Sequence, residues 1–207
     1  MTRTTRSAAL MAVLLVAGLA LTAGTAAAAP GKTLDNLQTA FNGESNANAK
    51  YLEFARKADQ EGYAGVASLF RAAAKAEEFH ARNHAEVIKK LGGTPKADIK
   101  PPVVKTTADN VKVAIEGEVY ERDTMYPEFI AEAKASGQND ALRSFNFAIA
   151  AEAQHAALYT EASAGLASWK AARTFYVCPL CGHTGTRLVP TLCPVCATAK
   201  DKFLKIK

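Results

Sequence analysis

Two short stretches of the sequence repeat the same pair of side chains at helical spacing. AKAEEFHARNH contains Glu77 and His80, and AAEAQHAAL contains Glu152 and His155, each pair three residues apart and surrounded by alanines. Residues three apart lie on one face of a helix, and a carboxylate beside an imidazole is a typical pair of metal ligands. A single Glu-x-x-His pair also occurs on solvent-facing helices, so the pairs must be judged by what surrounds them.

The two pairs belong to an internal repeat. FRAAAKAEEFHA, which begins at Phe70, aligns with FNFAIAAEAQHA, which begins at Phe145, at an offset of 75 residues. Phe, Ala, Ala, Glu, His and Ala match in register. Glu78 is replaced by Ala153 in the second copy, so the repeat singles out the glutamate one position earlier. The repeat indicates two related helices.

Two other segments supply further carboxylates. FNGESNANAKYLEF carries Glu44 seven residues before Tyr51, and EGEVYERDTMYPEF carries Glu118 and Glu121, three apart, before Tyr126. The two tyrosine hydroxyls could hydrogen-bond ligand carboxylates, or the rings could be ordinary core aromatics.

Four long segments are predicted to be helices that position these groups. They span residues of about 32–60, 63–91, 107 or 109–135, and 139–165. Two glycines end the second segment, and Asn139 is expected to cap the fourth. Short turns join the first two and the last two segments, and the longer TPKADIKPPVVK joins the pairs. Two hairpins with one crossover predict a ferritin-like four-helix bundle.

Folding each hairpin at its turn brings seven polar groups to one depth, roughly 25 Å from the turns at ~1.5 Å per residue. The seven are Glu44, Glu77, His80, Glu118, Glu121, Glu152 and His155. That many carboxylates cannot stay ionised in a core without compensation. One glutamate from each of two helices and Glu-x-x-His from each of the others is a carboxylate-bridged two-metal pattern. Its mixed ligands suit iron or manganese better than a closed zinc site.

Two further residues of these helices are notable. His84 lies seven residues after Glu77 on nearly the same helix face and is another candidate for touching the metals. Pro127 removes a backbone hydrogen bond from the third segment and is predicted to kink it.

Four cysteines stand near the C-terminus. Cys178, Cys181, Cys193 and Cys196 form two C-x2-C knuckles separated by eleven residues. Such knuckles turn four thiolates towards one tetrahedral iron or zinc, and disulfide pairs are the alternative in an oxidising compartment. His183 is not needed as a ligand and is predicted to lie on the surface.

The first residues predict export. Residues 1–29 combine two arginines, an apolar run and a small-residue site with cleavage expected within 26–29, which is typical of a secretory signal peptide. A membrane anchor is the alternative, although the run is short for a span. We therefore expect a periplasmic or otherwise exported protein with a bundle over 30–168 and a metal-binding knuckle domain over 169–207.

Charge is distributed unevenly between these parts. The whole chain has a formal net charge of +5, whereas residues 169–207 contain seven Lys/Arg and one Asp, a net +6. A basic tail could dock an acidic redox partner or a neighbouring subunit, or it could be an ordinary solvated surface. The sequence has no nucleic-acid-binding motif or aromatic-basic platform.

The chain resembles the rubrerythrin family over nearly all of its mature part. The resemblance rests on GES…Y, AEEFH, GEVYE…MYPEF, AEAQH and YVCPLCG…LCPVCA. It implies a mainly helical, ferritin-like bundle followed by a rubredoxin-like β knuckle. It further implies specific roles: Glu77 and Glu152 bridge two irons, Glu44 and Glu118 are terminal ligands, His155 holds one iron, Glu121 and His80 alternate on the other, Tyr51 and Tyr126 contact the ligands, and the four cysteines hold one further iron.

The same resemblance implies an activity and partners. The family's usual reaction is the reduction of hydrogen peroxide to water, with electrons relayed by the cysteine-bound iron. Related proteins form dimers in which one subunit's cysteine site lies near the other's di-iron site, so a homodimer or larger homo-oligomer is expected. Export would require a periplasmic electron donor. The alternatives are an iron-handling protein that oxidises ferrous iron, and a non-enzymatic module with structural zinc.

Overall fold

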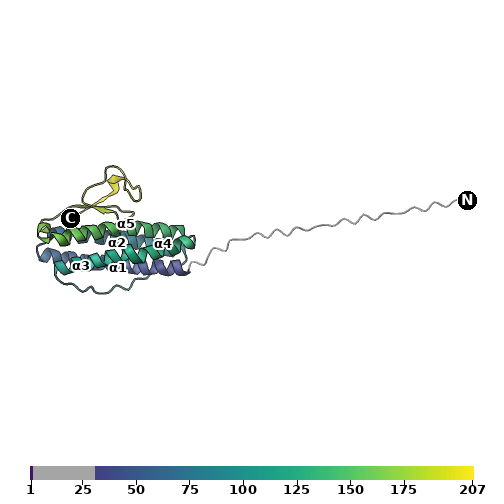
Figure 1. Ribbon diagram of the computed structural model, residues 1–207, viewed down its shortest axis with the longest axis horizontal. Helices are drawn as coiled ribbons and strands as arrows, with labels where there is room; N and C mark the ends of the chain where they lie inside the picture. The colour runs from purple at the N-terminus through teal and green to yellow at the C-terminus, as the bar shows by residue number, and fades with distance from the viewer. Residues whose placement is uncertain (2–30) are drawn as a thin grey trace.

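The computed structural model describes residue 1 and residues 31–207, so the predicted signal peptide lies outside the described residues. Within the described part, no helix is both long and apolar enough to cross a membrane. The long helices pack side by side as a bundle, with a small β domain on one side (Figure 1). The predicted mainly helical fold, a four-helix bundle followed by a β knuckle, is confirmed.

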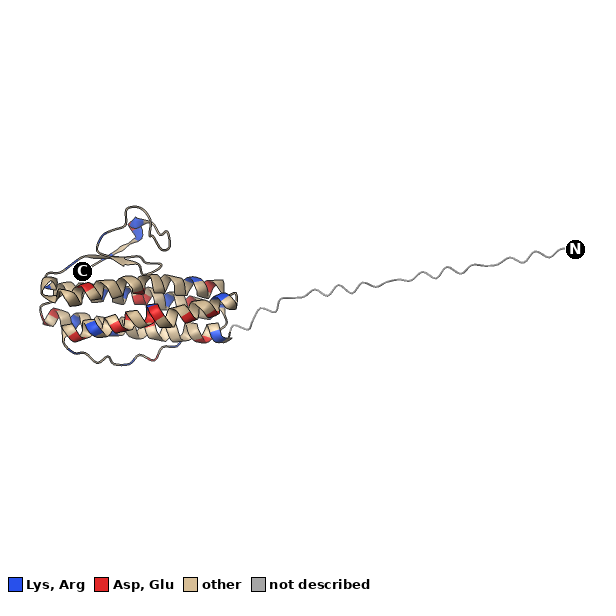
Figure 2. Ribbon diagram, in the orientation of Figure 1, with Lys and Arg blue, Asp and Glu red and all other residues tan. Residues whose placement is uncertain are grey.

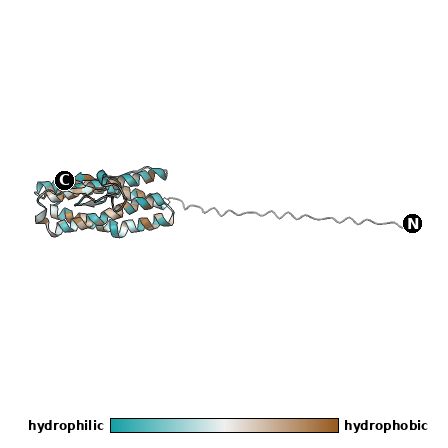
Figure 3. Cartoon of the chain, turned by 90° about the horizontal axis from the view of Figure 1, so that it is seen from above, coloured by the Kyte–Doolittle hydropathy of each residue, from teal (hydrophilic) through white to brown (hydrophobic). Residues whose placement is uncertain are grey.

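The first hairpin consists of α1 (Gly31–Gln60) and α2 (Ala64–Lys90), and the second of α3 (Thr107–Tyr120), α4 (Tyr126–Ala135) and α5 (Asn139–Ala164). Hydrophilic and hydrophobic residues alternate along each helix (Figure 3), as expected when one face of each packs inward. Acidic and basic residues are spread along the bundle (Figure 2). Asn139 is the first residue of α5 rather than its cap, since the cap position is Gln138, which makes no side-chain capping bond.

The third predicted helix is interrupted. A π-helical segment, η1 (Glu121–Met125), separates α3 from α4, and the Tyr126 N–H donates to the Glu121 carbonyl five residues back. Pro127 follows at once; it has no N–H to donate, and its ring excludes the carbonyl four residues earlier. The expected kink therefore takes the form of one wider turn, a feature that is frequent at functional sites.

The crossover between the hairpins is fastened to α1. Gln38 donates to the backbone carbonyl of Lys96 at 2.6 Å, while the side-chain oxygens of Asn42 and Asn46 each accept a backbone N–H from the segment 96–100 at 2.8 Å. These amides are four residues apart and share one helix face. They satisfy the backbone of an extended connection that has no strand beside it.

A short helical turn, η2 (Leu166–Trp169), links α5 to the knuckle domain, which contains β1 (Phe175–Val177), β2 (Thr184–Gly185), η3 (Lys200–Lys202) and β3 (Leu204–Ile206). The sheet is antiparallel with β1 in the centre. Trp169 is buried and stacks on Phe175 with ring centroids 6.3 Å apart. Gly65 allows this approach, because a Cβ there would lie 2.7 Å from the carbonyl of Trp169.

Two apolar clusters fill the bundle on either side of a polar layer. One is centred on Phe54, Phe70 and Tyr159, and the other contains Phe129 and Phe145. The layer between them holds six of the seven polar groups predicted to converge.

Candidate metal centres

Six side chains meet in this layer and form two overlapping groups. The first group is Glu44, Glu77, His80 and Glu152, and the second is Glu77, Glu118, Glu152 and His155; in each group the potential ligand atoms lie within 4.8 Å of one another. All six residues are buried. Each of the four predicted helical segments provides at least one of these side chains, from α1, α2, α3 and α5. Glu77 and Glu152 belong to both groups and are placed to bridge two ions.

Glu121 stands apart from both groups. It is the first residue of η1 and is half-buried. Burial and then the charge of Glu121 raise the pKa of Glu44, so the two carboxylates remain within electrostatic reach. The resemblance implies that Glu121 and His80 alternate on one iron, and in this structure the histidine occupies the ligand group while Glu121 lies outside it.

Contacts on the far side of each imidazole fix which nitrogen faces the carboxylates. His80 Nε2 lies 3.2 Å from the Cys181 carbonyl, which can only accept, so Nε2 carries the proton. His155 Nε2 lies 3.2 Å from Thr184 Oγ1, whose own hydroxyl donates to the Gly182 carbonyl. In the neutral rings Nδ1 is therefore a free lone pair facing the glutamates, as a metal ligand requires.

The donor set fits two cations. One oxygen each of Glu44, Glu77, Glu118 and Glu152 is buried without a hydrogen-bond partner among the described residues. Burying a charged carboxylate oxygen without a hydrogen-bond partner or a cation destabilises the folded protein. Burial raises the pKa of Glu118 to about 8. Two ions that share two carboxylates would satisfy these oxygens, and binding would displace protons from the site.

The metal-free protein is expected to lose stability as the pH rises from 6.5 to 8. Folded Glu118 keeps its proton up to a pKa of about 8, against 4.5 for a free carboxyl. Folded His80, despite the opposing effect of burial, has its pKa raised to about 10 by Glu152 and Glu77, against 6.5. In this window the folded state binds more protons, so raising the pH favours unfolding by up to about 2 kcal/mol per group.

Urea unfolding of the metal-free protein at the two pH values measures this effect. His84 does not obscure it, because burial lowers its pKa to about 3 and most of the change in its contribution falls below pH 6.5. Glu118→Gln should reduce the fall in stability. A wild-type free energy of unfolding that is flat or rising over the window would contradict the prediction.

Two tyrosines hold the outer glutamates. The Tyr51 hydroxyl donates to Glu118 Oε1 at 2.6 Å, and the Tyr126 hydroxyl donates to Glu44 Oε1. Both rings are buried. These are the hydrogen bonds that the sequence spacing suggested, and they orient the carboxylates.

His84 is not part of either ligand group. Its Nε2 lies 3.2 Å from the Tyr126 hydroxyl, and its Nδ1 lies 2.8 Å from Ser144 Oγ. The candidate metal contact is therefore replaced by a contact to a tyrosine that holds a ligand. Ser144 was not predicted from the sequence, because only the packing of α2 against α5 places it beside the histidine.

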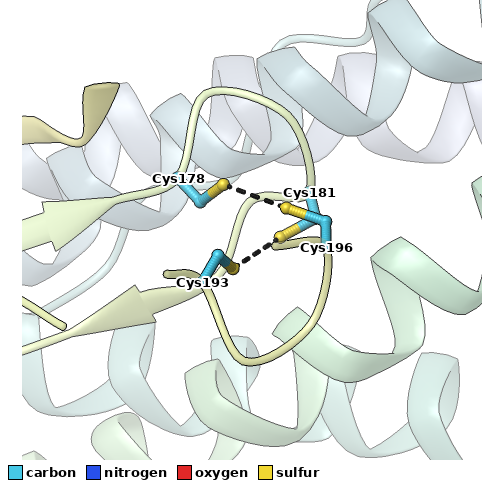
Figure 4. A group of neighbouring side chains, drawn as sticks. All are labelled: Cys178, Cys181, Cys193 and Cys196. Atoms are coloured by element: carbon cyan, nitrogen blue, oxygen red, sulfur yellow. Dashed lines mark hydrogen bonds between the residues drawn. The ribbon is translucent and has the colours of Figure 1, made fainter. Parts of the chain in front are cut away.

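The four cysteine sulfurs converge between the two knuckles (Figure 4). Cys178 and Cys196 sulfurs are 3.5 Å apart, as are those of Cys181 and Cys193. All four thiols are free, and 3.5 Å is far longer than a disulfide bond. Hydrogen bonds, first from the Cys181 thiol, lower the pKa of Cys178 to about 4. The arrangement fits a tetrahedral metal site with four thiolate ligands.

The knuckle domain covers the bundle site of its own chain. Besides the contacts to His80 and His155, Arg82 and Asn83 of α2 donate to the carbonyls of Pro179 and Leu180 at 2.6 and 2.7 Å. The closeness that the resemblance implies between subunits is thus found within one chain.

His183 also takes part in this contact. Its Nδ1 lies 2.6 Å from Gln154 Nε2 of α5, and the residue is half-buried. His183 therefore lies only partly at the surface, because the knuckle packs against α5.

Gly182→Ala is expected to lift the knuckle from the bundle. Gly182 has φ +74°, and a Cβ there would lie 2.2 Å from His80 Nε2. Both the left-handed backbone and the contact exclude a side chain. Hydrogen exchange should show lost protection of the backbone amides of residues 178–185, with the bundle interior unchanged. Gly137→Ala, at a turn with φ +69° and open space, is the matched control for backbone strain alone.

Comparisons with known proteins find a family model, curated relatives and solved structures that are similar to this chain. Residues 35–163 match the family model described as Rubrerythrin. The chain is 34% identical to Rubrerythrin-2 of Clostridium acetobutylicum, over 83% of this chain and 95% of that protein. It is 36% identical to nigerythrin of Nitratidesulfovibrio vulgaris, over 84% and 87%. A structure of fully reduced, all-ferrous nigerythrin superposes with a TM-score of 0.78 at 33% identity, covering 84% of this chain and 86% of that one.

Proposed function

The chain belongs to the rubrerythrin family, and on that premise we propose that it is a peroxidase that reduces hydrogen peroxide to water at its bundle centre. It carries a carboxylate/histidine di-iron site and a four-cysteine site for a single iron or zinc, which makes it an iron-binding oxidoreductase. The observation that carries the proposal is the pair of buried ligand groups sharing Glu77 and Glu152, directly beneath the cysteine knuckles.

The chemistry supplied by two bound ferrous ions is the delivery of two electrons to one peroxide. The balanced reaction consumes one hydrogen peroxide, two electrons and two protons and releases two waters. The residues Glu44, Glu77, His80, Glu118, Glu152 and His155 would hold the ions. Tyr51 and Tyr126 keep the outer carboxylates in place. The apolar clusters on both sides keep bulk water from the centre.

Glu121 is the one predicted ligand of the bundle centre that lies outside both ligand groups and is partly exposed. It is half-buried and begins the π segment, whereas the six grouped residues are buried. We propose that it is the ligand that exchanges with His80, as the resemblance implies.

Stopped-flow absorbance of the reduced, iron-loaded protein mixed with peroxide tests the function. We expect rapid oxidation, about one peroxide consumed per two electrons, as the balanced reaction requires, and little reaction with dioxygen. Metal analysis of the same sample identifies the ions. Fast oxidation by dioxygen with accumulating ferric iron would instead support an iron-handling protein, and a protein with zinc at the cysteines and an inert bundle would support a structural module.

We also propose that the mature protein acts outside the cytoplasm as a homo-oligomer and receives its electrons from a periplasmic donor. The proposal is supported by the predicted signal peptide and by the resemblance to oligomeric proteins. Cell fractionation with N-terminal sequencing tests export, and recovery of the unprocessed chain in the cytoplasm would contradict it.

A further inference from the structure

A line of hydrogen bonds leads from the Glu44 side of the centre towards the surface. Tyr126 donates to Glu44, His84 Nε2 contacts the Tyr126 hydroxyl at 3.2 Å, and His84 Nδ1 contacts Ser144 Oγ at 2.8 Å. Ser144 in turn lines a cleft of about 140 Å³ between α2, α5 and the knuckle. The cleft is also lined by ionisable side chains, among them Glu86, Lys90, Asp140 and Arg143.

The directions of these bonds are consistent along the whole line. The Tyr126 hydroxyl donates its proton to Glu44, so the Tyr126 oxygen accepts a hydrogen bond from His84 Nε2–H. His84 Nδ1 is then the acceptor and the Ser144 hydroxyl the donor. Burial keeps the ring neutral by lowering its pKa to about 3. A neutral imidazole that accepts at one nitrogen and donates at the other can pass a proton without a lasting change of charge.

The internal repeat provides a comparison within the same molecule. At the offset of 75 residues, Tyr126 corresponds to Tyr51, His84 to Tyr159 and Ser144 to Leu69. Tyr51 holds Glu118 as Tyr126 holds Glu44.

Behind Tyr51, however, the line stops. Tyr159 packs against the Tyr51 ring at 5.7 Å, and its hydroxyl has no hydrogen-bond partner among the described residues. Leu69 is fully buried and cannot carry a proton. The two halves share a ligand arrangement, but within the described structure only the half with His84 and Ser144 continues to a cleft.

We propose that Ser144, His84 and Tyr126 form a proton path from this cleft to the Glu44 side of the centre. The inference rests on the proposed function, since each peroxide reduced consumes two protons at a buried site. Protons enter at Ser144 from water in the cleft, and each transfer moves one inward along an existing hydrogen bond. In this path His84 and Ser144 hydrogen-bond to no ligand atom and act through Tyr126; the closest approach is the 4.0 Å between His84 Nε2 and Glu44 Oε1.

Ser144→Ala tests the path with little change in shape. In the metal-free protein, nitrogen-15 NMR should show exchange of the His84 ring proton with solvent slowed about tenfold. This is less than the ~10²–10⁴-fold that a positioned proton donor contributes, because water in the cleft takes over part of the hydroxyl's role as proton donor. In the iron-loaded protein, peroxide reduction should slow by a similar factor with a larger solvent isotope effect.

Ser144→Thr restores the hydroxyl and should restore both rates, which a merely structural role of the site would not predict. Tyr159→Phe is the matched control at the position equivalent to His84, and it should leave both rates unchanged. Ring-proton exchange that is unchanged or faster in Ser144→Ala would overturn the path. If the wild type does not reduce peroxide, the proposed function fails, while the exchange measurement on the metal-free protein still decides the path.

Discussion

Replacing Glu77 with alanine is expected to abolish two-iron binding and to reduce peroxidase activity by about 100-fold or more. Changes to residues that only support metal ligands already cost 10–100-fold, and Glu77 belongs to both ligand groups. Its Oε2 lies 2.8 Å from His80 Nδ1 and its Oε1 lies 3.2 Å from His155 Nδ1. A single substitution therefore removes a donor from both ion positions.

Iron per chain after anaerobic reconstitution measures this loss, with circular dichroism to verify the helical fold. Glu78→Ala is the matched control on the neighbouring residue. Glu78 is exposed and pairs with Lys75 at 2.8 Å on the outer face of α2. The control should bind two irons and retain wild-type activity. Full iron content in the Glu77 variant would show that the carboxylate is not shared by two ions.

The convergence of the ligands could be predicted because it depends on regular geometry. A constant rise per residue and a repeat of 75 residues relate Glu77 to Glu152 and His80 to His155 before any packing is known. The cysteine knuckles follow in the same way from local spacing.

The parts that escaped prediction depend on contacts between distant segments. The π segment arises from Pro127 inside a helix that must still pack on both sides, so its wider turn is a compromise that the local pattern does not specify. The partner of His84 is Ser144, sixty residues later. The knuckle's position over His80 involves residues about a hundred apart. No periodicity in the sequence records such pairs.

Zinc in place of iron at the four cysteines is expected to lower multiple-turnover peroxidase activity by about 100-fold or more while leaving single-turnover oxidation of the bundle irons unchanged. Zinc keeps the tetrahedral thiolate fold but does not change oxidation state. The knuckle is therefore expected to stay in place over the bundle, and only the proposed relay of electrons would be lost. The Cys181 carbonyl lies 3.2 Å from His80 Nε2, so the knuckle contacts a proposed iron ligand of the bundle directly.

The experiment compares one protein preparation loaded with iron or with zinc at the cysteines, with two irons in the bundle in both cases. Because no residue is changed, the outcome separates electron transfer from folding. A cysteine substitution would not separate them, since a small metal-bound domain depends on its metal to fold. Equal multiple-turnover rates would mean that electrons reach the bundle directly from the donor. The four-cysteine site would then be structural, and the contact between Cys181 and His80 would serve to hold the imidazole rather than to connect two redox centres.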